Sequence, residues 1–154
     1  MPRHRLATIG YEGTSLAAFL STLVDAGVEL LVDVRAVASS RRPGFSKTAL
    51  AANLSEAGIE YLQLRGLGTP ADGRAAARAG RHDELRRIYA EHLATPEAQA
   101  QLETLIGVVR SGRHACLLCY EANPDHCHRT LVAQGVAVQL PVELVHLHPG
   151  QDEE

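Results

Sequence analysis

The stretch VELLVDVR, residues 28–35, decides the fold class of this chain. It is a β-branched apolar run of strand length, so it predicts a strand. Gly27 precedes it, in the position where a helix usually ends. The residues before that glycine recur at helical spacing and predict a helix over 14–26; they are Leu16, Phe19, Leu20, Leu23 and Val24. The chain therefore enters this stretch from a helix through a glycine turn.

The alternation of strand and helix extends in both directions from residues 28–35. RLATIG, residues 5–10, predicts a strand before the first helix. Ser46 can cap a helix with Leu50 and Leu54 on one stripe, and IEYLQL, residues 59–64, predicts the strand after it. The later patterns predict helices over 82–93 and 96–111, a strand HACLLCY over 114–120, a helix capped by Asp125 that runs to about 138, and a strand VELVHL over 142–147.

This order of elements predicts a single α/β domain over residues 1–150. Strands that alternate with helices form a mainly parallel sheet through right-handed crossovers, here a five-stranded sheet with helices on both faces in a Rossmann-like three-layer arrangement. No linker divides the chain, and QDEE at 151–154 predicts an acidic C-terminal tail. RGLGTPADGRAAARAGR, residues 65–81, is polar and glycine-rich, and it predicts a long surface loop or a lid.

Composition narrows the classes of protein. The 154 residues carry 15 basic and 18 acidic side chains, a net charge of −3, which argues against a broadly basic coat for nucleic acid. No apolar run approaches the roughly 20 residues of a membrane span, and the N-terminus lacks a signal-peptide pattern, so we expect a soluble cytoplasmic protein without a membrane partner. The three cysteines are an odd number, and we expect them to be thiols.

Four polar stretches follow the predicted strands and locate a candidate site. They are GYEGT (10–14), DVRAVASSRRPGFS (33–46), LRGLGTP (64–70) and CYEANPDHCHR (119–129), whereas the opposite loops are short glycine turns. In parallel α/β sheets, ligands bind outside the carboxyl ends of the strands. We therefore predict one pocket at this edge of the sheet.

Arginines in these stretches predict that the pocket binds an anion. Arg41 and Arg42 stand together beside a proline–glycine turn, where adjacent cations favour a phosphate or a carboxylate. Arg129 lies in the predicted first turn of the helix after Asp125, where free N–H groups favour negative charge. It would serve either an outside ligand or the carboxylate of Glu121.

Three residues of the loop after the second predicted strand keep two interpretations each. Asp33 and Arg35 form either a buried structural ion pair or part of the anion site. Phe45 either stacks on a ligand ring or anchors its loop.

The loop CYEANPDHCHR could also carry chemistry. At a helix tip flanked by histidines, Cys127 would have a lowered pKa and act as a nucleophile; the alternative is a small residue packed under the helix. Glu121 is a candidate general acid or base, and the alternative is a solvent-facing carboxylate. No arginine stands six positions after any cysteine, as a phosphatase- or rhodanese-type loop requires.

Zinc binding is a further interpretation of the same loop. Cys116 and Cys119 are separated by two residues, but on a strand this spacing sends them to opposite faces. Cys119 with His126, Cys127 or His128 could still reach one ion. We assign no metal ligand on this basis. The glycine patterns of common dinucleotide- and nucleotide-binding loops are absent from the sequence.

Three segments together are typical of a known pattern: TIGYEGTSLAAFLSTL, ELLVDVRAVASSRRPGFSKTALAANLSEAGIEYLQLRGLG and LLCYEANPDHCHRTLVA. They resemble the domain-of-unknown-function 488 family, whose last segment follows C-x-E-x-x-P-x-x-C-H-R. The positions that match the family pattern are Tyr11, Asp33, Arg35, Arg41, Phe45, Leu67, Gly68, Cys119, Glu121, Pro124, Cys127, His128 and Arg129. The segment 69–81 departs from it, being shorter and richer in alanine than the usual insertion. The resemblance implies the fold and the position of the site, and it implies no reaction.

We therefore predict a pocket at the carboxyl ends of the strands that binds a small anionic, phosphate-bearing ligand. The candidate catalytic residues are Glu121, Cys127 and His128; the candidate ligand-binding residues are Tyr11, Asp33, Arg35, Arg41, Arg42, Phe45, Cys119 and Arg129. A nucleic-acid-binding module that uses the same arginines is the alternative, and a structural zinc protein is the third interpretation. No particular cofactor, reaction or oligomeric state follows from the residues.

Overall fold

A computed structural model describes residues 4–149 and contains one five-stranded sheet. The strand order is β3-β2-β4-β1-β5, and each neighbouring pair is parallel. The strands are β1 (His4–Gly10), β2 (Leu30–Asp33), β3 (Glu60–Gln63), β4 (Ala115–Cys119) and β5 (Val142–Leu147). The predicted α/β fold with a parallel five-stranded sheet is confirmed. The predicted tail at 151–154 lies outside the described residues.

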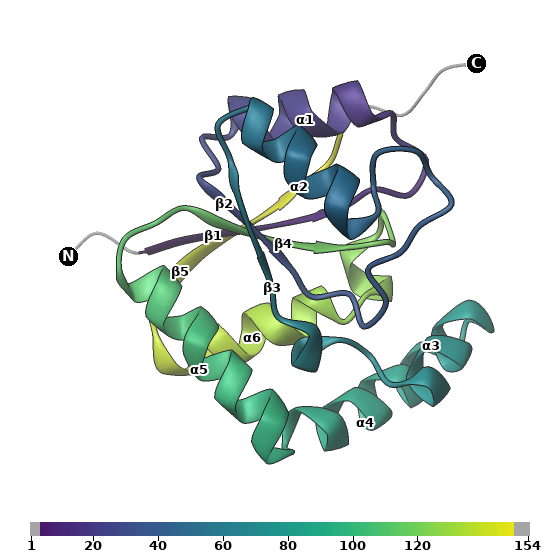
Figure 1. Ribbon diagram of the computed structural model, residues 1–154. Coiled ribbons are helices and arrows are strands. Elements are labelled where there is room, and N and C mark those ends of the chain that lie inside the picture. The colour runs from purple at the N-terminus through teal and green to yellow at the C-terminus, as the bar shows by residue number, and fades with distance from the viewer. Residues whose placement is uncertain (1–3, 150–154) are drawn as a thin grey trace.

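Helices cover both faces of this sheet, which gives the predicted three layers (Figure 1). On one face lie α1 (Leu16–Asp25) and α2 (Lys47–Glu56), and on the other lie α5 (Pro96–Arg110) and α6 (Arg129–Gln139). Two further helices, α3 (Ala71–Arg78) and α4 (His82–Leu93), precede α5 and extend beyond the sheet. None of the helices within residues 4–149 is both long enough and apolar enough to cross a membrane.

The two central strands explain why the sheet has a core on each side. Every residue of β2 and β4 is buried, and successive side chains on a strand point to opposite faces. Leu31 and Leu118 pack with Phe19 of α1 in one apolar cluster. Val32 and Leu117 pack with α5 and α6 in the other. Burial on both faces is the reason that these strands have near-continuous apolar sequences.

The prediction of a loop over 65–81 is wrong. The segment forms a 3-10 turn, Arg65–Leu67, followed by helix α3. The glycines of this segment favoured a loop over a helix. Gly73 is nevertheless buried inside α3, where an added Cβ would lie 2.5 Å from Thr69 Cγ2. The glycine therefore allows close packing, and the surrounding alanines favour the helix.

The helix predicted to start at Asp125 begins later than expected. Asn123 caps a 3-10 turn, Pro124–His126, by accepting a hydrogen bond from the Asp125 N–H at 2.9 Å. Cys127 is extended, and α6 starts at Arg129 with His128 in the N-cap position. Ser46 holds the N-cap position of α2 as predicted, but its Oγ accepts from the Ser40 N–H instead of capping the helix.

Gly10 at the end of β1 allows the backbone after β4 to approach closely. A Cβ at this position would lie 1.8 Å from the carbonyl oxygen of Glu121. We expect Gly10→Ala to lower the free energy of unfolding by about 2 kcal/mol or more, because backbone rather than a flexible side chain must move. Gly107→Ala is the control: a Cβ there meets no atom within 4 Å, and alanine in α5 should stabilise by about 0.5–1 kcal/mol. Urea unfolding measures both, and equal effects would contradict the close approach.

Candidate functional site

A cavity of about 270 Å³ lies at the carboxyl ends of β1, β2 and β4, the edge that the sequence predicted. Helix α3 and Leu85 of α4 also line the cavity. Among its lining residues are Tyr11, Arg35, Thr69, Arg74, Arg78, Cys119, Tyr120, Glu121, His126, Cys127 and His128. The three candidate catalytic residues therefore lie around one cavity.

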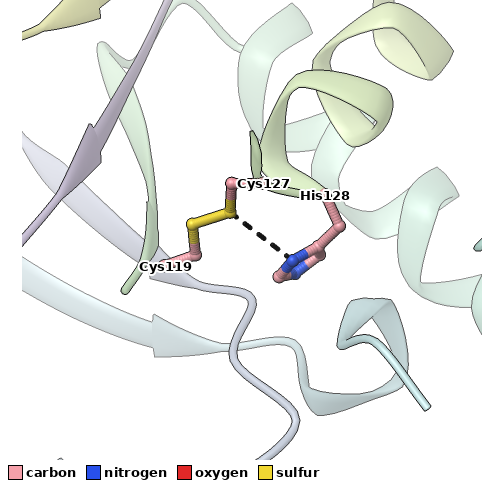
Figure 2. A group of neighbouring side chains, drawn as sticks. All are labelled: Cys119, Cys127 and His128. Atoms are coloured by element: carbon pink, nitrogen blue, oxygen red, sulfur yellow. Dashed lines mark hydrogen bonds between the residues drawn. A yellow bond between two sulfur atoms is a disulfide. The ribbon is translucent and has the colours of Figure 1, made fainter. Parts of the chain in front are cut away.

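A disulfide joins Cys119 at the end of β4 to Cys127 just before α6 (Figure 2). The expectation of thiols is wrong for this pair, because the intervening 3-10 turn folds the chain back and brings the two residues together. Cys116 is the free cysteine; it lies in the core, where burial raises the pKa of its thiol. Cys116 therefore lies in the core and Cys119 beside the cavity, and their spacing on the strand predicted that they would not meet.

His128 is buried beside the disulfide and holds a defined tautomer. Its Nε2 lies 2.7 Å from the carbonyl oxygen of Val34, and a carbonyl can only accept, so Nε2 carries the hydrogen. The unprotonated Nδ1 faces Cys127 Sγ at 3.6 Å (Figure 2). Burial lowers the pKa of His128 to about 4. The ring is therefore neutral at physiological pH and offers a lone pair to the cysteine.

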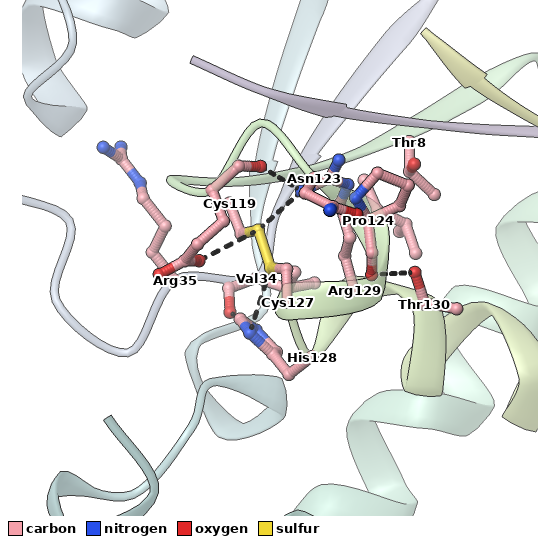
Figure 3. Close-up of a disulfide and its surroundings, with 12 residues drawn as sticks. Thr8, Val34, Arg35, Cys119, Asn123, Pro124, Cys127, His128, Arg129 and Thr130 are labelled. Atoms are coloured by element: carbon pink, nitrogen blue, oxygen red, sulfur yellow. Dashed lines mark hydrogen bonds between the residues drawn. A yellow bond between two sulfur atoms is a disulfide. The ribbon is translucent and has the colours of Figure 1, made fainter. Parts of the chain in front are cut away.

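Arg129 lies inside the protein, with none of its surface exposed. Its Nη1 donates to Cys119 Sγ at 3.0 Å and to the carbonyl oxygen of Glu121, and its Nη2 donates to the carbonyl oxygen of Ala122 at 3.2 Å. Figure 3 shows the side chain beneath this loop. Within residues 4–149 it forms no ion pair with a carboxylate. Burial lowers the pKa of Arg129 to about 10, so it stays cationic at neutral pH.

Asp33 and Arg35 form a buried bidentate ion pair. Arg35 Nε donates to Oδ1 at 2.9 Å and Nη2 to Oδ2 at 2.7 Å, while the Tyr61 hydroxyl donates to Oδ2 at 2.6 Å. Burial alone would lower the pKa of Arg35, but the bonds and attraction to Asp33 raise it above its ordinary value. Nη1 also donates to the Phe45 carbonyl at 2.8 Å. The pair has the structural role that the sequence left open, and Arg35 also borders the cavity.

The other predicted anion binders lie away from the cavity. Arg41 is exposed, and Arg42 donates to the Thr14 carbonyl while its guanidinium lies 5.7 Å from the centre of the Phe45 ring. Phe45 is 1% exposed and stacks on Tyr11 with ring centres 4.5 Å apart, so it anchors its loop. Arg129, enclosed as described above, is likewise not among the lining residues.

The sequence analysis missed the two arginines that do line the cavity from α3. Arg74 and Arg78 are one helical turn apart, and neither forms an ion pair within the part of the chain that is described. Arg74 Nη1 donates to the Thr69 carbonyl at 2.9 Å. Their spacing of four residues was the available signal, but it has meaning only on a helix, and the segment was predicted as a loop.

Glu121 completes the site at the end of β4. Its Oε1 lies 3.8 Å from Cys119 Sγ, and burial raises the pKa of its carboxyl group. A carboxyl group in this state is closer to the protonation range of a general acid or base.

These features define a class of protein: a three-layer α/β protein with a cavity at the carboxyl ends of its parallel strands and a disulfide among the residues that line the cavity. The family model "Domain of unknown function DUF488" matches residues 15–136, and the chain belongs to this family. The resemblance seen in the sequence is confirmed. No curated protein and no solved structure matches the chain.

Removal of Asp33 tests the structural role of the buried pair. We expect Asp33→Ala to lower the free energy of unfolding by about 3–5 kcal/mol, because Arg35 keeps a buried charge without its partner. The double variant Asp33→Leu with Arg35→Met should recover a large part of the loss, since it removes both charges. Urea unfolding measures both, and a single variant as stable as the wild type would contradict the role.

The buried neutral His128 predicts a pH dependence of stability. Its pKa falls from 6.5 to about 4 on folding, so the unfolded chain binds the proton first as the pH drops. The contribution of His128 to the free energy of unfolding is fully present above pH 6.5. It should be lost as the pH falls towards 4, which lowers the free energy of unfolding by roughly 3 kcal/mol in total.

His128→Gln should remove this dependence while keeping an N–H for the Val34 carbonyl. We expect the stability difference between wild type and variant to shrink as the pH falls from 7 to 4, measured by urea unfolding. Glu121 titrates in both proteins and cancels in the comparison. A difference that is independent of pH would contradict a neutral buried ring.

Proposed function

We propose that the cavity binds a small ligand with an anionic group and an apolar part. The observation that carries this proposal is the pair Arg74 and Arg78, which line the cavity without a carboxylate partner among the described residues. Two guanidinium groups on one helix face can bind one phosphate or carboxylate through several charge-assisted hydrogen bonds.

The charge balance around the cavity favours an anion. The charge of Arg35 is already offset by Asp33. Glu121 is the acidic residue of the lining, so one carboxyl group faces two arginines of α3, and burial raises the pKa of that carboxyl group. The two arginines of α3 therefore leave an excess of positive charge on that wall.

The rest of the lining supports a ligand that is partly apolar. Tyr11, Tyr120, Val37 and Leu85 contribute aromatic and aliphatic surface. A cavity of about 270 Å³ is close to the lower end of the roughly 300–1,000 Å³ typical of small-molecule sites. A monomeric phosphate or carboxylate ester has a suitable size and polarity.

The predicted catalytic residues would stand next to such a ligand. Glu121 and His128 supply an acid and a base on one wall, and Cys127 lies between the helix tip and the cavity. In the disulfide form Cys127 is not a free nucleophile, so a nucleophilic role belongs to the reduced protein.

Phenyl phosphate is a suitable probe because it combines an anionic group with an aromatic ring. We expect saturable binding to the wild type by isothermal titration calorimetry. Arg74→Gln with Arg78→Gln should weaken it by about 10-fold or more, because a hydrogen bond to a charged group contributes about 1.5–3 kcal/mol.

The control is Arg86→Gln with Arg87→Gln, which removes the same number of charges from two exposed positions of the neighbouring helix α4, where each arginine forms a surface ion pair. It should leave binding unchanged. Absence of saturable binding, or equal weakening by both double variants, would sink the proposal. Tighter binding of single-stranded DNA, with a steep loss of affinity as salt is raised, would instead favour the nucleic-acid alternative.

A further inference from the structure

We propose that Cys119 and Cys127 form a reactive thiol–disulfide centre that exchanges with a small anionic thiol bound in the cavity. Cys127 is the sulfur attacked, and Cys119 is the leaving thiolate. The choice of an anionic thiol rests on the proposed function, whereas the reactivity of the pair does not.

The first support is that the disulfide lines the cavity. Cys119 and Cys127 both belong to the lining, with 1% and 4% of their surfaces exposed. A molecule held in the cavity would therefore lie next to these two residues, whereas Cys116 lies in the core and is not among the lining residues. Access is a requirement for thiol–disulfide exchange.

The second and stronger support is that Arg129 forms no ion pair within residues 4–149. The guanidinium is fully buried, and its contacts are two carbonyl oxygens and Cys119 Sγ. Its Nε has no hydrogen-bond partner among the described residues. The Glu121 carboxyl group attracts this cation but is not in contact with it, and a buried cation without a counter-charge in contact is costly.

Reduction of the disulfide would give Arg129 a counter-charge in direct contact. A thiolate at Cys119 would place a negative charge 3.0 Å from Arg129 Nη1, and a nearby cation lowers a cysteine pKa. The Glu121 carboxyl group, with Oε1 3.8 Å from the same sulfur, opposes this effect when it is charged, but the contact with the arginine is shorter. Stabilising the reduced form makes a disulfide a better oxidant. The same contact makes Cys119 the better leaving group, since thiols of low pKa leave faster.

His128 supplies the matching group for the other sulfur. Its Nδ1 faces Cys127 Sγ at 3.6 Å, with the hydrogen held on Nε2 by the Val34 carbonyl. Nδ1 can therefore accept a proton and pass it to Cys127. Each sulfur thus has its own partner, one cationic and one basic.

The exchange takes place in two steps. A thiolate RS⁻ attacks Cys127 Sγ, the S–S bond breaks, and its electron pair goes to Cys119, which leaves a mixed disulfide R–S–S–Cys127. A second RS⁻ attacks the R-bearing sulfur, RSSR is released, and Cys127 takes one proton through His128. In total two RSH become RSSR, two electrons reach the protein, and the second proton goes to solvent while Cys119 stays a thiolate beside Arg129.

The same atoms could alternatively hold a soft metal ion. Cys119, Cys127 and His128 offer ligand atoms within 4.8 Å of one another, and a histidine that donates its second N–H to a carbonyl is typical of zinc sites. We favour exchange because it explains both the bonded sulfurs and the contact of Arg129, which forms no ion pair within residues 4–149, with Cys119 Sγ. Zinc binding is an outcome of the test below.

The first experiment equilibrates the full chain with 2-mercaptoethanol and its disulfide at varied ratios, and measures alkylated cysteines by mass spectrometry. We expect reversible, two-electron reduction of Cys119 and Cys127 in the folded protein, with Cys116 unmodified. Arg129→Met should shift the equilibrium constant towards the disulfide by about 10-fold or more, the size of one unit of thiol pKa. No reduction of the folded wild type, or an unchanged equilibrium in a folded Arg129→Met, overturns the proposal.

A second measurement does not depend on the folding of the Arg129 variant. In reduced Cys127→Ser, the rate of alkylation of Cys119 is followed against pH. We expect its apparent pKa to lie well below the ordinary value of about 8.5. An ordinary or raised value overturns the proposal. So does reduced wild type that binds one equivalent of Zn²⁺ and resists alkylation at both cysteines, since that outcome identifies a metal site.

The substrate class is tested separately with mercaptoacetate, which carries a carboxylate, against neutral 2-mercaptoethanol. We expect mercaptoacetate to be preferred by the wild type, after correction for thiol pKa, and the preference to be lost in Arg74→Gln with Arg78→Gln. Equal preference in both proteins overturns the anionic class and counts against the proposed function, while reduction by 2-mercaptoethanol still supports the reactive pair. Failure of reduction by both thiols counts against the pair alone.

Discussion

The site depends on one constraint, the enclosure of the Arg129 guanidinium beneath the loop that follows β4. A cation without exposed surface needs acceptors, and here those of the two terminal nitrogens are the carbonyl oxygens of Glu121 and Ala122 and the sulfur of Cys119. These bonds tie the end of the central strand to the start of α6. They also place Cys119 beside Cys127, and the close approach at Gly10 leaves the loop little room to shift.

Arg35 is also buried, and comparison with it shows which contact Arg129 lacks. Arg35 shares two hydrogen bonds with Asp33, and its pKa is raised above its ordinary value, whereas the pKa of Arg129 is lowered to about 10 by burial. The charge of Arg35 is paired with that of Asp33, and Arg35 also supports the loop that carries Phe45 through a hydrogen bond to its carbonyl oxygen. Arg129 instead donates to the sulfur of Cys119 and forms no ion pair within residues 4–149. This difference separates a structural ion pair from a charge available to stabilise a thiolate.

The positions of the candidate residues were predicted correctly where they depended on topology, and wrongly where they depended on side-chain direction. Parallel strands bring their carboxyl ends to one edge, so Tyr11, Glu121, Cys127 and His128 were correctly expected near one another. The directions of Arg42 and Arg129 depend on carbonyl groups of other loops, those of Thr14, Glu121 and Ala122, and such loops have no periodic pattern. Arg74 and Arg78 were missed because glycine and proline residues around an alanine-rich helix resemble a loop.

The sequence by itself determined the alternation of strands and helices, the two-sided burial of β2 and β4, and the edge at which polar residues gather, because hydrophobic periodicity and glycine turns act over short distances. Tertiary structure alone decided that β4 lies between β1 and β2, that Cys119 meets Cys127, and that Arg74 and Arg78 of α3 line the cavity. These are contacts between segments whose separation in the chain carries no information about distance. They arise only when packing chooses which faces meet.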